Sequence, residues 1–539
     1  MPSTPTTKSQ VQAHQFVLRR MQSALVRRDA VMLNDPMRTH SRATIVGFVL
    51  GALGILGFVI FGLISPQPSV PESGNIVIGE QSGTVYVVAG YPKKLIPTFN
   101  LASARLLLMT LQNQAAGQQG GAAAPAGSGA AVKNATVVAD AQLANIPRGK
   151  LTGIPDGPQL LPNDQQRISN NWAVCDEIKL NPALQDPTSI NKKETTVLAG
   201  VPNLGTELAV GEALLATNDN GRTYLIYRLS SNANQPYANA VRAEVDSTSG
   251  PVSSALGLTI SKPRKISNEL LNAIPEVPRL TAPTFDSPGT QPTFALGGLV
   301  VGDVFYTLPT GGGKDFWVIT RTGKQRVSPA VADIIRTART GSNASIPVRG
   351  LDQIQNIKSL MPGDAGYLPV DDYPEQRPLV LDPAKQSPVA CLGWNITGIG
   401  DGRAPHTAVF VGSGVPGPKD QAITVGTPSP DGWKIDKFSM QPGFAAVVQS
   451  ATVKETFGKG NIQLISDRGL RYGVPDVKTA QALGLDNPQP APDSILKLLP
   501  TGASLNIQDV LKTFDSVPID PNAGAFPSSQ AQAAPATGK

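Results

Sequence analysis

One uncharged stretch constrains this chain more than any other feature. Residues 43–64 read ATIVGFVLGALGILGFVIFGLI and contain no charged side chain. As a helix rising 1.5 Å per residue, the stretch would be roughly 33 Å long, enough to cross the hydrocarbon core of a bilayer. No second stretch of this kind occurs in the sequence. The sequence therefore predicts a short N-terminal arm, one transmembrane helix and a large body on the other side of the membrane.

The charges of the arm predict its side of the membrane. Residues 1–42 hold seven basic and two acidic side chains, so they carry +5 of the chain's formal charge of +6. By the positive-inside rule, the arm is cytoplasmic and the body is periplasmic, with the helix in the inner (plasma) membrane. We interpret the helix as an uncleaved anchor because no small-residue cleavage site follows it; a signal sequence that is cleaved late is the alternative.

The arm itself is predicted to form an amphipathic helix over residues 7–30. Its apolar residues recur near helical spacing, and Arg19, Arg20, Arg27 and Arg28 form two basic pairs between them. Such a helix binds the lipid of the inner membrane or docks on a partner protein, and the sequence leaves both open. The body is nearly neutral and has no basic stripe, so nucleic acid is not an expected partner.

The chain has two cysteines, Cys175 and Cys391, and both fall in the predicted body. An even number of cysteines in an oxidising compartment indicates one disulfide. Two separate buried thiols are the alternative. A tryptophan lies three residues from each cysteine, at Trp172 and Trp394, which fits a core shared around the bridge.

Internal repetition is the second strong feature of the body. Four segments read as strand, turn and strand, beginning after Gly83, Gly221, Gly313 and Gly460. A helix-like run follows in the first, third and fourth copies, whereas it is short in the second. The predicted fold class is α+β: one N-terminal transmembrane helix and a large β-rich periplasmic domain with four ββα-like repeat modules around a central core.

Shifts in composition divide the chain further, because Pro/Gly-rich and low-complexity stretches separate the apolar segments. The predicted segments are a cytoplasmic arm (1–42), the transmembrane helix (43–64), a linker (65–81), module 1 (82–112), a low-complexity linker (113–134), the first part of the core (135–215), module 2 (216–260), a connection (261–300), module 3 (301–340), the second part of the core (341–455), module 4 with the C-terminal region (456–520) and a disordered tail (521–539).

The residues of the body predict no catalytic, cofactor or metal site. His406 is the one histidine after the span, and two cysteines beside one histidine do not supply a common zinc ligand set. The glycine-rich string before Lys314 has Leu308 and Asp315 where a phosphate-binding loop needs glycine and serine or threonine. The adjacent pair Asp371 and Asp372 is typical of a solvated loop.

Phrases along most of the chain resemble the EccB family, the membrane-anchored core component of the mycobacterial type VII (ESX) secretion system. The order of these phrases over more than 450 residues makes the resemblance specific. They include FVLRR (16–20), ALVRRD (24–29), NLASARL (100–106), WAVCD (172–176), LLNAIPEVP (270–278) and RYGVP (471–475). The sequence departs from the family in the second repeat, in an Ala/Gly insertion after Leu111, and at Thr513–Ser516.

The resemblance implies a structural core subunit that supports protein export across the mycobacterial envelope. It implies a disulfide between Cys175 and Cys391 and four repeats around a core. It also implies self-association, together with partners of the EccC, EccD and EccE types and the MycP protease. The family carries an ATPase label, so ATP is the one cofactor to consider, although the residues give that label no physical support. A periplasmic nucleotide hydrolase and a peptidoglycan-binding module are the two alternative functions.

Overall fold

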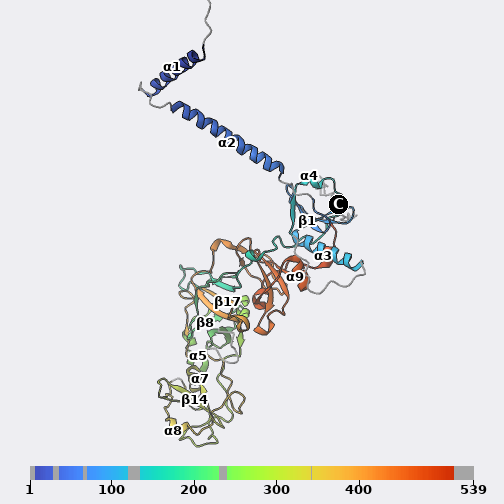
Figure 1. The fold of residues 1–539 in the computed structure, drawn as a ribbon. Coiled ribbons are helices and arrows are strands. Elements are labelled where there is room, and N and C mark those ends of the chain that lie inside the picture. Colours follow the sequence, from blue (N-terminus) through green and yellow to red (C-terminus); the bar gives the residue numbers. More distant parts are fainter. Residues whose placement is uncertain are drawn as a thin grey trace, which may run out of the picture. The chain divides into compact units, whose positions relative to one another are not determined.

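The computed structural model describes most of the chain. The described residues are 7–27, 36–64, 70–118, 134–229, 240–341 and 343–514. Arg28, most of the predicted low-complexity linker and the predicted tail lie outside them. The chain divides into two compact units, Met1–Val70 and Pro71–Lys539, and each is described by itself (Figure 1).

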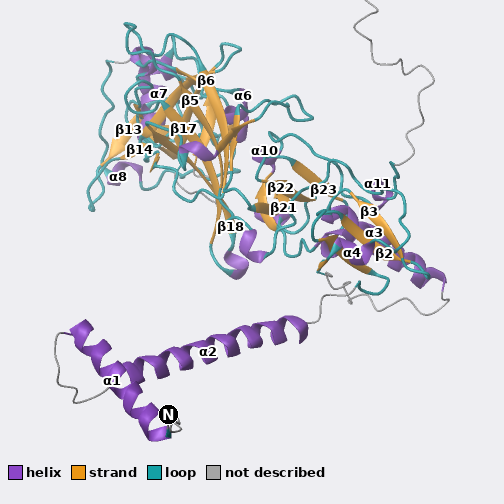
Figure 2. Ribbon diagram, turned by 90° about the horizontal axis from the view of Figure 1, so that it is seen from above, coloured by secondary structure: helices purple, strands orange, loops and turns teal. Residues whose placement is uncertain are grey.

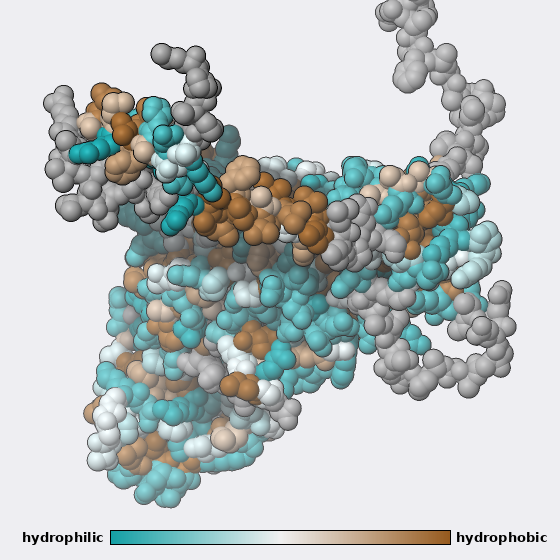
Figure 3. Space-filling view, turned by 45° about the horizontal axis from the view of Figure 1, so that its top comes forward, coloured by the Kyte–Doolittle hydropathy of each residue, from teal (hydrophilic) through white to brown (hydrophobic). Residues whose placement is uncertain are grey.

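The first unit contains the helices α1 (Lys8–Arg27) and α2 (Pro36–Ile64). Within α2, the segment Arg42–Gly62 has a mean hydropathy of 2.5, and none of it is buried within the structure. Its apolar side chains form an unbroken surface in Figure 3. Among the described residues, this is the one helix long and apolar enough to cross a membrane, as the sequence predicted.

The second unit is a mixed α+β body, which confirms the predicted fold class (Figure 2). Four parts of it share one topology, and we name them R1 (residues 75–152), R2 (212–277), R3 (304–360) and R4 (445–502). Each begins with a three-stranded antiparallel meander followed by a helix. The ββα unit expected from the sequence therefore lies within a larger unit that has one more strand in front.

The elements of the repeats follow one another in the same order along the chain. In R1 they are β1 (Asn75–Gly79), β2 (Val85–Ala89), β3 (Lys94–Thr98), α3 (Leu101–Gln118), β4 (Thr136–Val138) and α4 (Asp140–Leu143). In R2 they are β8 (Glu212–Thr217), β9 (Thr223–Arg228), β10 (Ala240–Glu244), α5 (Pro251–Leu256), β11 (Arg264–Lys265), α6 (Asn268–Ala273) and β12 (Glu276–Val277). In R3 they are β13 (Val304–Thr307), β14 (Asp315–Ile319), β15 (Lys324–Val327), α7 (Pro329–Thr340) and α8 (Leu351–Ile354). In R4 they are β21 (Ala445–Ala451), β22 (Ile462–Ser466), β23 (Arg471–Val474), α9 (Val477–Leu483), β24 (Gln489–Pro492) and α10 (Asp493–Leu496).

After the helix, each repeat returns to its own meander twice. A fourth strand pairs in parallel with the first strand: β4 with β1, β11 with β8, β24 with β21, and a single bridge at Val348 with β13. A short helix then leads to a segment that pairs in parallel with the third strand. The first backbone hydrogen bonds of this last pairing are Leu95 N to Pro147 O, Arg242 N to Pro275 O, Lys324 N to Lys358 O, and Arg471 N to Pro500 O.

Local sequence sets where the long helices of the repeats begin and end. The Ser328 side chain accepts a hydrogen bond from the backbone N–H of Val331 at the start of α7, and Pro329 occupies the first helical position. Asp476 caps α9 in the same way through Thr479. The helix α9 ends at Gly484, whose φ of 75° suits a residue without a Cβ atom.

The central core is a seven-stranded sheet with the order β19-β20-β6-β5-β17-β18-β7. Its strands are β5 (Trp172–Ile178), β6 (Lys193–Ala199), β7 (Thr206–Glu207), β17 (Val389–Thr397), β18 (Ala404–Gly412), β19 (Ala422–Thr424) and β20 (Lys437–Ser439). One apolar cluster joins this sheet to R2 and R4, since it contains Val174, Ile226 and Ile465. The remaining elements are β16 (Leu379–Val380), which extends the R2 sheet beside β8, and α11 (Ile507–Val510) after R4.

The outer repeats attach to the inner ones through their helices. Helix α3 of R1 contacts α9 of R4, and their side chains share one apolar cluster that includes Leu106 and Leu483. Helix α5 of R2 contacts α7 of R3, where Leu256 and Ile334 share another. The contacts therefore run in the order R1, R4, core, R2, R3.

A cation lies against an aromatic ring of the second strand in three of the repeats. The pairs are Arg148 over Tyr86 in R1 at 5.9 Å, Arg242 over Tyr224 in R2 at 5.5 Å, and Lys324 over Trp317 in R3 at 5.2 Å. In R3 the Lys324 ammonium is buried and donates to the carbonyl oxygens of Ile354 and Ile357 at 2.8 and 2.7 Å. Ile354 is the last residue of the short helix α8, so the cation also interacts favourably with the negative end of that helix.

We expect Lys324→Met to lower the free energy of unfolding of R3 by about 1–3 kcal/mol, because two buried carbonyls lose their donor. Urea unfolding and hydrogen exchange at residues 351–360 would measure the loss. Arg326→Met is the matched control on the same strand. Its side chain is exposed and pairs with Asp315 at the surface, so its removal should cost under about 1 kcal/mol. Equal losses in the two variants would contradict the role given to Lys324.

Candidate functional site

Two halves of the chain meet at the centre of the core sheet. Strand β5 pairs with β17 in antiparallel register, with Cys175 opposite Cys391 and Trp172 opposite Trp394. The two cysteines form a disulfide across 216 residues of sequence, with Cα atoms 3.9 Å apart. Both are buried in an apolar cluster with Leu198 and Val389. The structure thus brings together the two sulfur atoms that the sequence singled out.

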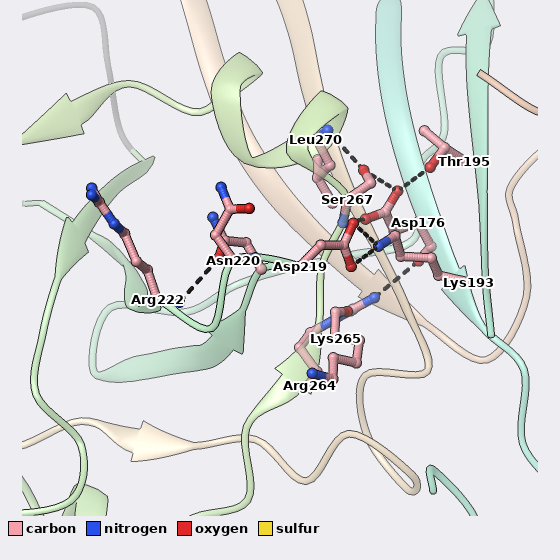
Figure 4. Close-up of polar contacts among 11 residues, drawn as sticks. Asp176, Lys193, Thr195, Asp219, Asn220, Arg222, Arg264, Lys265, Ser267 and Leu270 are labelled. Carbon is pink, nitrogen blue, oxygen red and sulfur yellow. Dashed lines mark hydrogen bonds and ion pairs between the residues drawn. The ribbon is translucent and has the colours of Figure 1, made fainter. Parts of the chain in front are cut away.

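A buried carboxylate lies directly beside this bridge, on the opposite face of β5 (Figure 4). Asp176 Oδ1 accepts hydrogen bonds from the hydroxyls of Thr195 and Ser267, both at 2.8 Å, and Oδ2 accepts from the backbone N–H of Ser267 at 2.6 Å. Ser267 Oγ in turn accepts from the N–H of Leu270 and caps α6. Asp176 therefore ties two core strands to the start of a helix of R2.

Arg264 adds a buried positive charge to the same junction. Its guanidinium donates to the backbone oxygens of Ser387 and Asp176 at 2.9 and 3.1 Å. Burial raises the pKa of Asp176, while the Ser267 N–H and the charge of Arg264 act against that rise. Burial lowers the pKa of Arg264 to about 10. Each charge is thus buried away from water, and the hydrogen bonds and the opposite charge around it stabilise it.

An ion pair joins the core to R2 nearer the surface. Lys193 Nζ lies 2.5 and 2.7 Å from the two carboxylate oxygens of Asp219, in the turn between β8 and β9 (Figure 4). The Asp176 cluster and this pair hold the core against R2, whereas the disulfide joins two strands of the core itself. The Asp176 cluster was not predicted from the sequence. Asp176 itself could have indicated the cluster. It lies on the same face of the strand as Trp172 and Val174, where period-two alternation predicts an apolar side chain.

The positions that the sequence analysis tested for catalysis lie on separate elements. The glycine-rich string 311–313 forms part of the loop between β13 and β14, and Lys314 stacks on Tyr306 at 4.6 Å. A phosphate-binding loop leads from a strand into a helix, so this hairpin has a different geometry. Asp371 accepts a hydrogen bond from the Tyr367 hydroxyl at 2.8 Å. His406 lies in β18, where burial lowers its pKa.

The described residues show no group of three or more His, Cys, Asp or Glu that could hold a metal ion. A hollow of about 550 Å³ opens at one end of the core sheet, and its lining includes Gly200, Pro202, Pro418, Met440 and Phe444. This lining has no nucleophile beside a base and no pair of carboxylates, which are the arrangements that acid–base or covalent catalysis needs.

The basic residues predicted to anchor the arm lie on or beside α1. Arg19 and Arg20 are exposed in the middle of the helix, and Arg27 is its last residue. Apolar side chains are also exposed on α1, notably Leu18 and Leu25, seven residues apart and so on one face.

Comparison with known proteins identifies the chain's family. A family model described as the type VII secretion system ESX-1, transport TM domain B, matches residues 3–519. This chain belongs to the EccB family. EccB chains are structural core subunits of type VII secretion, which confirms the resemblance seen in the sequence and the class of function it implied.

Several relatives match nearly the whole chain. The ESX-3 secretion system ATPase EccB3 of Mycolicibacterium smegmatis is 29% identical, over 97% of this chain and 94% of the relative. The ESX-1 secretion system ATPase EccB1 of Mycobacterium tuberculosis is 27% identical, over 97% and 98%. The printed names of both relatives carry the word ATPase.

Solved EccB structures share the fold. A chain of an intact ESX-5 inner membrane complex superimposes with a TM-score of 0.64 at 25% identity, covering 98% of this chain and 99% of that one. A chain of the EccB3 dimer from the ESX-3 core complex gives 0.62 at 25% identity, with 81% and 100% covered. This EccB chain is accordingly an inner-membrane component with one candidate transmembrane helix.

Proposed function

We propose that this EccB chain acts as a scaffold in a type VII secretion complex, in which its arm is cytoplasmic, α2 crosses the inner membrane and its body assembles in the periplasm. The proposed partners are EccC, EccD and EccE type components, the MycP protease and further copies of the chain. The observation that carries the proposal is how the core and the repeats of the body are joined to one another. Every joint named above consists of apolar packing, a disulfide or a buried hydrogen-bonded charge, as in a rigid structural part.

The related structures support assembly with other chains. One comes from an inner membrane complex and another from an EccB3 dimer. The charge of the arm supports its cytoplasmic placement, because five of the six excess positive charges precede the span. We propose that Arg19, Arg20, Arg27 and Arg28 hold the arm at the cytoplasmic face, against lipid or a partner of the complex. Peptidoglycan is a further proposed contact of the body.

Purification through a C-terminal tag in mild detergent, at native expression, tests the scaffold proposal. We expect a species of megadalton size that contains a cytoplasmic ATPase partner, measured by native gel and mass spectrometry. Such a result would leave the chain with no need for an ATPase activity of its own. A monomer or dimer alone, obtained reproducibly, would contradict the scaffold and favour nucleotide or glycan binding by the body.

A further inference from the structure

The tip of one hairpin in R1 is fastened to the point where the chain enters the body. The tip is the turn at residues 90–93 between β2 and β3. The Ser73 hydroxyl donates to the Gly90 carbonyl at 2.6 Å, and the Lys93 ammonium lies 2.9 Å from a carboxylate oxygen of Glu72. The backbone N–H of Gly74 donates to the Val88 carbonyl at 2.8 Å. The tip therefore stays within a few ångströms of residues 72–74.

The distance from this point to the span is limited by the chain. Ile64 is the last residue of α2, so eight peptide units separate it from Glu72. Even a fully extended chain covers at most about 3.5 Å per residue, or about 28 Å in total. When α2 crosses the bilayer, the tip therefore cannot lie farther than about this length from the end of α2. Tethering of this kind gives an effective concentration in the millimolar range, so weak contacts with the leaflet are enough to hold the tip against it.

The side chains at the tip have the chemistry of a membrane interface. Tyr91 is 89% exposed, and a tyrosine presents an apolar ring with a polar end, the combination enriched at the headgroup level of membranes. Lys94 follows the tip directly, and Arg148 and Lys150 lie on the segment that runs along β3, since Leu95 pairs with Arg148 and the N–H of Gly149 donates to Leu95 O. All three side chains are exposed. Basic residues near an anionic surface are attracted to it, and their contributions add.

The acidic neighbours offset only part of this charge. Glu72 already pairs with Lys93. Asp140, whose charge interacts with Arg148, accepts hydrogen bonds from the Ser82 hydroxyl and from the backbone N–H groups of Gln81 and Ser82. Lys94 and Lys150 have no carboxylate partner among the ion pairs of the described residues. A single exposed tyrosine is ordinary on a protein surface. The combination with a basic cluster and a short tether to the span is what points to lipid.

We propose that the R1 tip surface, made of Tyr91, Lys94, Arg148 and Lys150, rests on anionic phospholipid headgroups of the leaflet that faces the body. The Tyr91 ring lies at headgroup depth, and the basic side chains contact lipid phosphates. The contact rests on the proposed topology, in which α2 crosses the membrane. The contact gives the body a second attachment to the membrane, in addition to the span. Two attachments fix the tilt of the body relative to the membrane, whereas one flexible connection leaves this tilt free.

Fluorescence quenching in reconstituted full-length protein tests this contact. The two native cysteines are joined to each other, so Tyr91→Cys provides one thiol for an environment-sensitive dye. The vesicles contain phosphatidylcholine with or without phosphatidylglycerol, and a lipid with a nitroxide near its headgroup. Ile260→Cys is the matched control, because Ile260 is 85% exposed but lies in the short 3-10 helix after α5 of R2.

We expect quenching of the dye at position 91 to be at least about threefold stronger than at position 260, and to fall without phosphatidylglycerol or at high salt. Adding Lys94→Glu and Lys150→Glu should reduce quenching at 91 to the control level. Equal quenching at both positions would overturn the proposal. Quenching at 91 that is independent of anionic lipid would overturn the proposed headgroup ligand. Complex size does not enter this measurement, so it separates a failed lipid contact from a failed scaffold.

Discussion

Loss of the disulfide is expected to have the largest effect on the stability of the body. The variant Cys175→Ser frees a cross-link between residues 216 apart in sequence. The chain-entropy model gives such a cross-link about 5 kcal/mol, through the larger freedom of the unfolded chain. We therefore expect a much lower free energy of unfolding, less EccB in the membrane and lower secretion. Chemical denaturation of the purified protein and its abundance in membranes would measure both effects.

Two comparisons make the disulfide experiment decisive. The double variant Cys175→Ala and Cys391→Ala removes the bridge without burying a hydroxyl or leaving a free thiol, so it isolates the contribution of the cross-link. Restoring protein level through higher expression should restore secretion, because the bridge has no chemical role in this proposal. Normal thermal stability and normal assembly of Cys175→Ser would refute the assigned role.

Asp176→Asn is expected to cost about 3–5 kcal/mol, the usual loss when a buried charge is left uncompensated. The amide has only one oxygen, so its NH2 group would face either the Ser267 N–H or the hydroxyls of Thr195 and Ser267 where an acceptor now lies. Arg264 would also keep its buried charge without the nearby carboxylate. Denaturant unfolding would measure the loss, and we expect the joint between the core and R2 to open first, as seen by hydrogen exchange in α6.

Lys193→Met is the matched control for Asp176. It removes an ion pair between the same two parts of the body, but Asp219 is largely exposed, so the expected loss is under about 1 kcal/mol. The pH dependence offers a second readout. Because burial raises the pKa of Asp176 above 3.8, this group makes the fold lose stability as pH rises from the unfolded pKa to the folded one. Asp176→Asn should lack that slope, and an unchanged slope would contradict the assignment.

The sequence predicted the parts of this fold that carry strong local signals. An uninterrupted apolar run predicts the candidate transmembrane helix. The exposed apolar side chains of this helix are stable in the hydrocarbon core of a bilayer. The meander hairpins follow from apolar strands separated by glycine turns. The first strand of each repeat was missed, because runs such as NIVIG and EALLAT are too short to distinguish from other buried segments.

The closing strands and the polar joints have weaker signals in the sequence. Strand β11 has two residues and depends on β8 for its hydrogen bonds, so no local pattern marks it. Arg264 lies in that strand, and its partners are 88 and 123 residues away in the chain. Contacts of this range are made by the tertiary fold alone. Asp176 is the exception, since a charged residue inside the apolar run WAVCDEI was visible from the start.

The order of contacts in the body also sets an order for its folding. R2 and R3 are neighbours in the chain, and the two halves of the core enclose them in sequence. R4 then adds to the core, and R1 packs on R4 last. In that last contact, Arg105 of α3 donates to the Leu483 carbonyl of α9, 378 residues away. In this order, the segments closest together in the chain pair first and the most distant ones pair last. In the proposed topology, R1 is the first repeat to emerge from the membrane. Because distant segments pair slowly, it waits longest for its partner R4. Its apolar helix face is exposed during that wait, which is the interval in which an envelope chaperone would be needed.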